Sequence, residues 1–326
     1  MENTAIDKLR HKLGAELESV NSFIESSLAT ANPLMGMAVS QYLKTKGKQI
    51  RPLLVLMSAS MFGRVNEITL HAAASIEMLH NASLIHDDVV DATLMRRGKD
   101  TLNKVFDNRI AVLVGDFFVS NALSEALKTS DNRIVMSIAE LGKELSIGEI
   151  DQINNAREHS LDESRYMDMI GKKTASLFMK CVRMGAFSAG ASSQEVASIE
   201  NFANLLGLCF QIRDDVFDYF EDKEIGKPTG NDLRENKVSL PLIYAISTAE
   251  KSDSDRMRSL LAKGNLDDEE IATLIEFAKA NGGIEYSYDV MKSLRDKSFA
   301  ILETLPANEW RDAFAYIMDY TISRHN

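Results

Sequence analysis

The sequence is short of the residues that interrupt or cross-link a polypeptide. Its 326 residues include five prolines, 17 glycines and two cysteines. Apolar residues recur at three- and four-residue spacing almost throughout, whereas strand-like alternation is absent. Cys181 and Cys209 lie in apolar helical runs, which favours buried, reduced thiols and gives no sign of a zinc site. The composition therefore predicts an all-α fold.

Positive charge and long apolar runs are also scarce. Lys and Arg number 37 against 48 Asp and Glu, a formal net charge of -11, so nucleic acid is not an expected partner. No uninterrupted apolar run approaches the roughly 20 residues that span a bilayer. Residues 1–10 lack the apolar core of a signal peptide. We therefore expect a soluble, cytoplasmic enzyme.

The hydrophobic content of 45% suffices for one large core or two small ones. No compositional break or long Pro/Gly/Ser linker divides the chain, so a single domain over residues 1–326 is expected. Long helices with short connections predict a bundle whose sites are built from side chains on facing helices. The periodicity predicts helices at residues 4–30, 34–45, 50–62, 66–91, 105–129, 132–156, 161–188, 194–220, 239–250, 254–263, 267–280, 283–304 and 307–323.

Two matched acid triplets stand out. Asp87, Asp88 and Asp91 close one apolar run, and Asp214, Asp215 and Asp218 close another, both in the pattern D-D-x-x-D. On a helix the first and last acids of each triplet lie one turn apart on one face. Carboxylates on buried helices repel one another and lose hydration, so they require cations or metals. Oxygen ligands favour hard ions such as Mg²⁺, which binds carboxylates together with substrate phosphates. Solvated acids at exposed helix ends are the alternative.

Basic residues near the first triplet could bind anions. Lys48 and Arg51 precede a helix with Pro52 in its first turn and could grip a phosphate, although such pairs are usually solvated. His80 lies two turns before Asp87 on the same face, where a pocket role competes with that of a core histidine. Arg96 and Arg97, with Gly98 permitting a turn, either bind a ligand or only neutralise the aspartates.

Polar residues also lie beside the second triplet. Lys173 and Thr174 sit in an apolar helix, and a lysine facing into a bundle requires an anion. Gln211 shares the face of Asp214 and Asp215 and could hydrogen-bond a metal-bound water or a phosphate oxygen. The Gly226–Gly230 loop could close as a lid.

With these motifs, residues 48–237 resemble the trans-isoprenyl diphosphate synthases of the polyprenyl synthetase family, most closely the medium- to long-chain, octaprenyl type found in bacteria. The resemblance implies a large helical bundle of the isoprenoid synthase type with a central cavity. It also implies consecutive head-to-tail trans condensations of isopentenyl diphosphate onto an allylic diphosphate primer, with quinone side chains as the end use.

The resemblance assigns roles residue by residue. The two triplets hold three Mg²⁺ ions through Asp87, Asp88, Asp91, Asp214, Asp215 and Asp218. Isopentenyl diphosphate is bound by Lys48, Arg51, His80 and Arg97. The allylic diphosphate is bound by Arg96, Lys173, Thr174, Gln211, Lys227 and Lys237. Asp87, Asp88, Asp214 and Lys173 carry the catalysis. A homodimer, with at most peripheral membrane contact for product release, is implied too.

Three alternatives stay open. A class I terpene cyclase would carry an N-D-x-x-S-x-x-x-E type second motif, which residues 211–220 do not show. A non-catalytic subunit of a heteromeric synthase would have degraded acid motifs, and both are intact here. The third is a short-chain farnesyl or geranylgeranyl synthase, which usually closes the level of Ala82 and Ser83 with an aromatic residue. These two small residues imply an open corridor and a longer product, with Leu113, Phe117 or Phe118 as its floor. The alternative is that Ala82 only permits close packing of helices.

Overall fold

The computed structural model describes residues 5–44, 49–96, 98–220 and 229–323, and within them the predicted all-α fold is confirmed. Lys48, Arg97 and Lys227 lie outside the described residues. The described strands are β1 (Met95–Arg96) and β2 (Lys99–Asp100), which form an antiparallel hairpin with Met95 opposite Asp100. Gly98 has a φ of +73° in this hairpin, which explains the glycine expected at a turn there.

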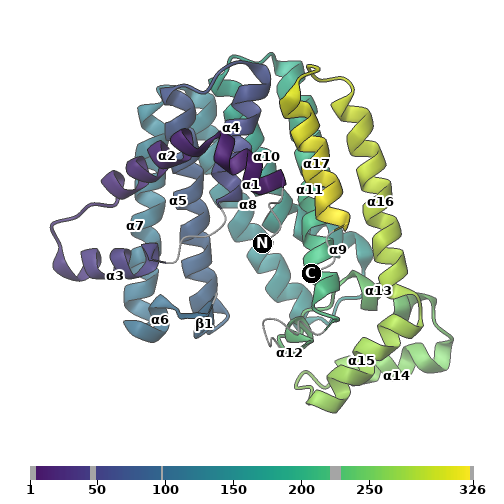
Figure 1. The fold of residues 1–326 in the computed structure, drawn as a ribbon. Coiled ribbons are helices and arrows are strands. Elements are labelled where there is room, and N and C mark those ends of the chain that lie inside the picture. The colour runs from purple at the N-terminus through teal and green to yellow at the C-terminus, as the bar shows by residue number, and fades with distance from the viewer. Residues whose placement is uncertain (1–4, 45–48, 97, 221–228, 324–326) are drawn as a thin grey trace. The chain divides into compact units, whose positions relative to one another are not determined.

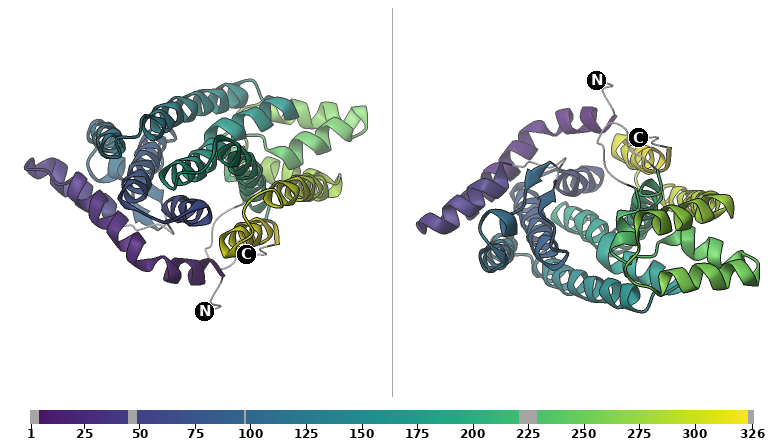
Figure 2. Two further views of the ribbon diagram at one scale, coloured as in Figure 1. Left: turned by 90° about the horizontal axis from the view of Figure 1, so that it is seen from above. Right: turned by 90° about the horizontal axis from the view of Figure 1, so that it is seen from below.

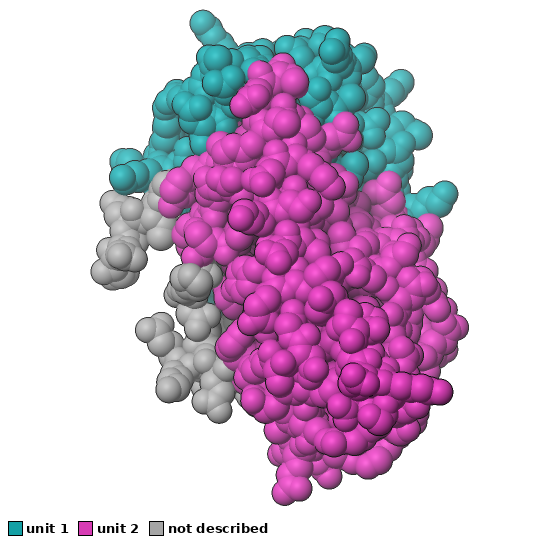
Figure 3. Space-filling view, turned by 90° about the vertical axis from the view of Figure 1, so that its right-hand side faces the viewer, with its two compact units in different colours: residues 1–143, 177–200, 305–313 teal, residues 144–176, 201–304, 314–326 magenta. Residues whose placement is uncertain are grey.

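The chain forms two compact units, coloured separately in Figure 3. Unit 1 comprises residues 1–143, 177–200 and 305–313, and unit 2 comprises residues 144–176, 201–304 and 314–326. Long stretches of α8 (Asn132–Arg157), α11 (Ser193–Phe217) and α17 (Glu309–Ser323) belong to each of the two units. The single domain expected from composition stays a prediction.

The other helices of unit 1 are labelled in Figure 1. They are α1 (Ala5–Lys12), α2 (Gly14–Ser27), α3 (Pro33–Leu43), α4 (Ile50–Phe62), α5 (Glu67–Val90), α6 (Leu102–Val105), α7 (Asn108–Lys128) and α10 (Ser176–Ser188). The predicted helix at 4–30 is broken at Leu13, and α5 begins and ends within one residue of its prediction.

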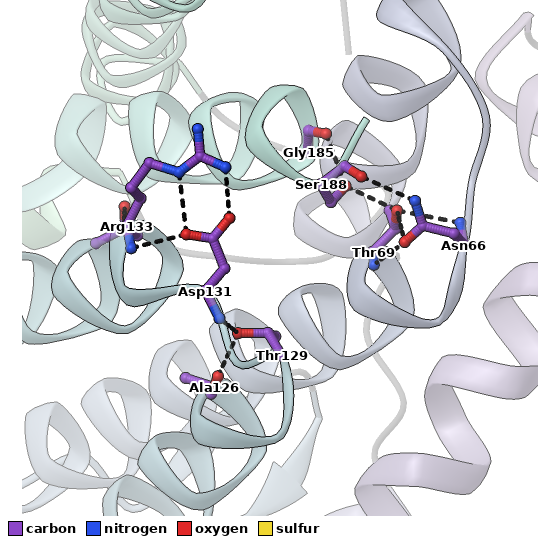
Figure 4. A network of polar contacts seen from close by, with 9 residues as sticks. Asn66, Thr69, Ala126, Thr129, Asp131, Arg133, Gly185 and Ser188 are labelled. Carbon is purple, nitrogen blue, oxygen red and sulfur yellow. Dashed lines mark hydrogen bonds and ion pairs between the residues drawn. The ribbon is translucent and has the colours of Figure 1, made fainter. Parts of the chain in front are cut away.

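Helix α5 begins at a capping box. The side chain of Asn66 accepts the backbone N–H of Thr69, and the hydroxyl of Thr69 accepts the N–H of Asn66. Thr69 also lies 2.7 Å from the hydroxyl of Ser188, as Figure 4 shows. At the start of α8, Asp131 accepts hydrogen bonds from two guanidinium nitrogens of Arg133, at 3.0 and 2.6 Å. The same figure shows this pair. These polar contacts fix the helix ends of unit 1.

Helices α5 and α7 lie side by side in Figures 1 and 2. Small residues allow the close approach, since a Cβ on Gly115 of α7 would lie 2.2 Å from the imidazole of His86. The hydroxyl of Ser75 donates to the carbonyl of Ala122 at 2.7 Å. Among the described helices, α7 alone is long and apolar enough to cross a membrane by length and composition. Its apolar content therefore serves both a face packed on α5 and an exposed face.

Unit 2 is built on the second half of α11. Its other elements are α9 (Glu163–Ile170), a π-helical segment η1 (Gly171–Ala175), α12 (Asn231–Arg234), α13 (Leu240–Thr248), α14 (Lys251–Leu261), α15 (Asp268–Ala280) and α16 (Gly283–Leu302). Helix α13 packs against α14, α15 and α16 around Val216, Leu242 and Leu274. The helix predicted at 161–188 is thus continuous but contains a π segment that apolar spacing did not indicate.

Among the described acidic residues of unit 1, Glu125 of α7 is the most buried, with 1% of its side chain exposed. It accepts hydrogen bonds from Ser27, Lys128 and His71, the last at 2.5 Å. Burial alone would raise the pKa of Glu125, but these hydrogen bonds outweigh it and leave the pKa below its ordinary value.

This lowered pKa predicts a pH-dependent loss of stability. The contribution of Glu125 is present above the carboxyl's unfolded pKa and is lost as the pH falls through the folded pKa. Between roughly pH 5 and pH 3, the wild type should therefore lose more free energy of unfolding than Glu125→Gln. Urea denaturation at each pH measures this, with the exposed Glu309→Gln as the control. Equal pH slopes for the wild type and Glu125→Gln would contradict the prediction.

Candidate active site

The first acid triplet lies at the C-terminal end of α5 in unit 1. Asp88 is 4% exposed and accepts a 2.7 Å hydrogen bond from Nε of Arg96 on β1. Burial raises the pKa of Asp88 above its ordinary value, although Arg96 lowers it. Asp87 and Asp91 are half-buried. Arg96 therefore neutralises one aspartate in this structure, and the hairpin is tied to the motif.

In unit 1, His80 is buried and Arg51 is half-buried. His80 is 8% exposed, and the guanidinium carbon of Arg51 lies 5.9 Å from the ring centre of Phe178. Glu77, one turn before His80, is buried with it. Cys181 lies close enough for the charges of Arg51 and Glu77 to act on its thiol, whose pKa burial raises strongly. The predicted buried, reduced cysteines are confirmed for both Cys181 and Cys209.

The residues expected to control chain length differ in burial. Ala82 is fully buried, and the half-buried Ser83 donates its hydroxyl to the carbonyl of His80 at 2.9 Å. Of the expected floor residues, Phe118 is fully buried and packs edge-on against Tyr42 at 5.4 Å. Leu113 is 56% exposed. The choice of a floor residue stays a prediction.

The three acids of the second triplet have different environments in unit 2. Asp215 is buried and accepts hydrogen bonds from the phenol of Tyr166 at 2.5 Å and the amide of Gln211 at 2.7 Å. Asp214 is exposed. Asp218 is half-buried and accepts the backbone N–H of Asp232 at 2.9 Å. Asp215 is thus buried while its neighbour Asp214 is exposed, because neighbouring helix positions point in different directions.

Burial raises the pKa of Asp215 well above its ordinary value, and the nearby Asp232 raises it further. Hydrogen bonds from Tyr166 and Gln211 act in the opposite direction. The pKa of Tyr166 is raised by burial and then by the charge of Asp215. The phenol therefore keeps its proton and donates it in the hydrogen bond.

Unit 2 contains a cavity of about 170 Å³. Four predicted allylic-diphosphate residues and Asp215 share its wall with residues that were not predicted. The lining consists of Gln152, Tyr166, Met169, Ile170, Lys173, Thr174, Gln211, Asp215, Asp232, Lys237, Val238 and Ser239. The sequence patterns thus identified much of one site without its geometry.

The π segment supplies Lys173 and Thr174 to this cavity. Nζ of Lys173 lies 2.5 Å from the carboxylate of Glu149 and 2.5 Å from the side-chain oxygen of Gln152. Thr174 donates to the side-chain oxygen of Gln211 at 2.6 Å. The segment is packed closely: a Cβ on Gly148 would lie 2.7 Å from the backbone nitrogen of Lys173, and one on Gly207 would lie 2.5 Å from Cα of Ala175.

Comparison with known proteins connects these residues to a family. The polyprenyl synthetase family matches residues 32–278, which contain both acid triplets and every cavity residue. The chain belongs to the polyprenyl synthetase family. The octaprenyl diphosphate synthase of Escherichia coli K12 is 30% identical, covering 98% of this chain and 99% of that protein. The short chain isoprenyl diphosphate synthase of Methanothermobacter thermautotrophicus is 33% identical, covering 95% and 96%.

A solved structure agrees with these relatives. The polyprenyl synthase from Caulobacter crescentus CB15, complexed with calcium and isoprenyl diphosphate, superposes with a TM-score of 0.91. It is 28% identical and covers 100% of both chains. This chain is accordingly a transferase of the trans-prenyl diphosphate synthase type. The relatives include both short- and long-chain enzymes, so membership does not fix the product.

Within the described part of this polyprenyl synthetase, no three His, Cys, Asp or Glu side chains are grouped closely enough to hold a metal by themselves. Sequence reasoning missed Glu77, Glu149, Gln152, Tyr166 and Asp232. The sequence did contain one sign of Glu149 and Gln152: they lie three residues apart and therefore share one face of the predicted helix. Tyr166 likewise precedes Lys173 by two helical turns.

The Tyr166 hydrogen bond predicts that Tyr166→Phe lowers both stability and prenyl transfer. The change leaves an oxygen of buried Asp215 without its donor, which costs about 1–3 kcal/mol of unfolding free energy. We expect turnover to fall about tenfold as the carboxylate loses its orientation. Denaturation and steady-state kinetics measure the two effects. Tyr286→Phe is the control, because Tyr286 donates to Glu163 outside the cavity. Equal turnover in both variants would contradict the role of Tyr166.

Proposed function

We propose that this enzyme adds isopentenyl diphosphate repeatedly, head to tail and in the trans configuration, to an allylic diphosphate primer. The proposed product is a medium- to long-chain, octaprenyl-like diphosphate for quinone side chains, made in the cytoplasm. The observation that carries the proposal is the cavity where Lys173, Thr174 and Gln211 meet Asp215. A cationic, hydrogen-bonding wall beside a metal-binding acid motif suits a diphosphate.

The acid triplets fit Mg²⁺ by their chemistry. Both present only carboxylate oxygens, and in each triplet a half-buried or exposed aspartate accompanies one that is held by other side chains. We assign Asp87, Asp88, Asp91, Asp214, Asp215 and Asp218 to three Mg²⁺ ions with substrate bound. The ions would neutralise charge that develops on the departing diphosphate.

The protein's own part is to bind the two diphosphates and exclude other reactions. Lys173, Thr174, Gln211 and Lys237 hold the allylic diphosphate, and the resemblance assigns Arg96 to the same ligand. Arg51 and His80 hold isopentenyl diphosphate. Lys48 and Arg97 belong with this second set, and Lys227 with the first, by resemblance alone.

The reaction needs no protein nucleophile. The allylic carbon–oxygen bond breaks, the double bond of isopentenyl diphosphate forms the new carbon–carbon bond, and a proton leaves the resulting cation. The released diphosphate accepts that proton. Cationic groups ordered around the leaving group before it departs would supply much of the rate enhancement.

A homodimer is proposed for the enzyme. The exposed face of α7 carries Val112, Leu113, Leu123 and Leu127, each between 37% and 63% exposed. Apolar side chains gathered on one helix face are typical of an interface. A monomeric mass by light scattering would contradict this assignment. Any membrane contact is proposed to be peripheral and to serve product release.

The metal assignment predicts that Asp87→Asn or Asp214→Asn abolishes most turnover without unfolding the protein. Loss of a carboxylate ligand removes several kcal/mol of transition-state stabilisation, on the order of a thousandfold in rate. Radiolabelled isopentenyl diphosphate, farnesyl diphosphate and Mg²⁺ provide the assay. Asp100→Asn is the control, since Asp100 pairs with Lys104 at the surface. Activity within tenfold of wild type for both variants would refute the metal assignment.

The corridor assignment predicts that Ala82→Phe shortens the product to farnesyl or geranylgeranyl length. An isoprene unit is roughly 5 Å long, close to the 5.4 Å pitch of a helix, so each unit needs about one turn of open corridor along α5. Product sizing by chromatography, with the rate of the first condensation as a folding check, tests this. Ser83→Ala is the control and should keep the product length. A short product from the wild type would instead favour the short-chain function, to which the Methanothermobacter relative points.

A further inference from the structure

The immediate surroundings of Lys173 suggest a function for a residue outside the assigned site. Two acceptors on α8, Glu149 and Gln152, each lie 2.5 Å from Nζ of Lys173. An ammonium group has three donors, so it can still donate to a further acceptor while it contacts both side chains. Lys173 and Gln152 line the cavity, whereas Glu149 is absent from its wall. Glu149 therefore contacts the lysine and not the space that a ligand would fill.

A contribution to the stability of the fold does not explain the ion pair between Lys173 and Glu149 well. The side chains of Lys173 and Glu149 are only 26% and 15% exposed, so both charges have lost much of their hydration. The second carboxylate oxygen of Glu149 is buried and has no hydrogen-bond partner among the described residues. Partly buried ion pairs seldom stabilise a protein more than apolar residues would, and an unsatisfied oxygen adds to the cost. The pair therefore calls for a functional explanation.

The local structure brings these groups together. Positions 149 and 152 share one face of α8, so both side chains reach the same ammonium group. Gly148 lets that face approach the π segment, since any side chain there would collide with the backbone of Lys173. π segments often mark functional sites because they displace side chains from the regular helical pattern.

The neighbouring lysine provides a contrast within the same helix pair. Lys172 bonds Asp151 at 2.8 Å and Asp168 at 2.6 Å, and these three side chains are 35% to 63% exposed. Such surface pairs are hydrated and contribute little. Lys172 does not line the cavity. Asp151 thus offers a matched control for Glu149.

We propose that Glu149, assisted by Gln152, is a positioning residue that holds the ammonium group of Lys173 at the cavity wall for a diphosphate. A free lysine side chain loses rotamer freedom when it binds an anion, and a lysine that is already held loses less. The inference rests on the proposed function, because it takes Lys173 as a ligand of the allylic diphosphate.

The test uses the full chain and four variants: Glu149→Ala, Lys173→Ala, the double variant and Asp151→Ala. Calorimetry with inorganic pyrophosphate and Mg²⁺ measures anion affinity, and steady-state kinetics separate kcat from each KM. Glu149→Ala should weaken pyrophosphate binding and kcat about tenfold, with the KM for isopentenyl diphosphate unchanged. Because Glu149 acts through Lys173, its removal in the Lys173→Ala background should have less than about a twofold effect. Asp151→Ala should match the wild type.

The outcomes distinguish the proposed role of Lys173 in diphosphate binding from the positioning role of Glu149. If Lys173→Ala keeps wild-type pyrophosphate affinity and turnover, the proposed role of Lys173 is wrong. If Lys173→Ala is impaired while Glu149→Ala is not, or if the two losses multiply in the double variant, the positioning role is overturned. Should Glu149→Ala not fold, Glu149→Leu restores the volume without an acceptor, and wild-type pyrophosphate affinity in that variant would overturn it equally.

Discussion

The hydrogen bonds to Asp215 link three parts of unit 2. A buried carboxylate keeps its place only where donors replace its lost water, and Tyr166 of α9 and Gln211 of α11 serve its two oxygens. Thr174 donates to the side-chain oxygen of Gln211, which leaves the amide nitrogen directed at Asp215. One buried acid thus fixes the relation among α9, α11 and the π segment, and the cavity wall follows from that relation.

Unit 1 meets the same requirement with cations. Asp88 is held by Arg96, and Glu125 by Lys128 together with Ser27 and His71. A cationic side chain can exchange one anionic partner for another that binds it more strongly. A neutral phenol interacts less strongly with an anion. Asp88 of the first triplet is therefore held by a charged partner, and Asp215 of the second by neutral donors.

Sequence periodicity predicted the long, largely buried helix α5 well. Helix α5 begins at Glu67 and ends at Val90, against a prediction of 66–91. The positions of both triplets and of Lys173, Thr174 and Gln211 also followed from motifs. The partners did not, because Glu149, Gln152 and Tyr166 meet the motif residues only through packing between helices. The burial of single positions did not follow from motifs either. Asp214 is exposed beside the buried Asp215, because spacing gives the period of a helix while tertiary contacts decide which face is covered.

The π segment also bears on how such a protein changes by mutation. Its shape depends on the number of residues in the turn more than on their identity, since a π turn closes its hydrogen bonds over one more residue than an α turn. An alanine scan across Gly171–Ala175 would alter side chains while leaving the wide turn in place. Deletion of a single residue would convert the π turn into an α turn. In this region a deletion therefore changes the backbone in a way that substitutions do not.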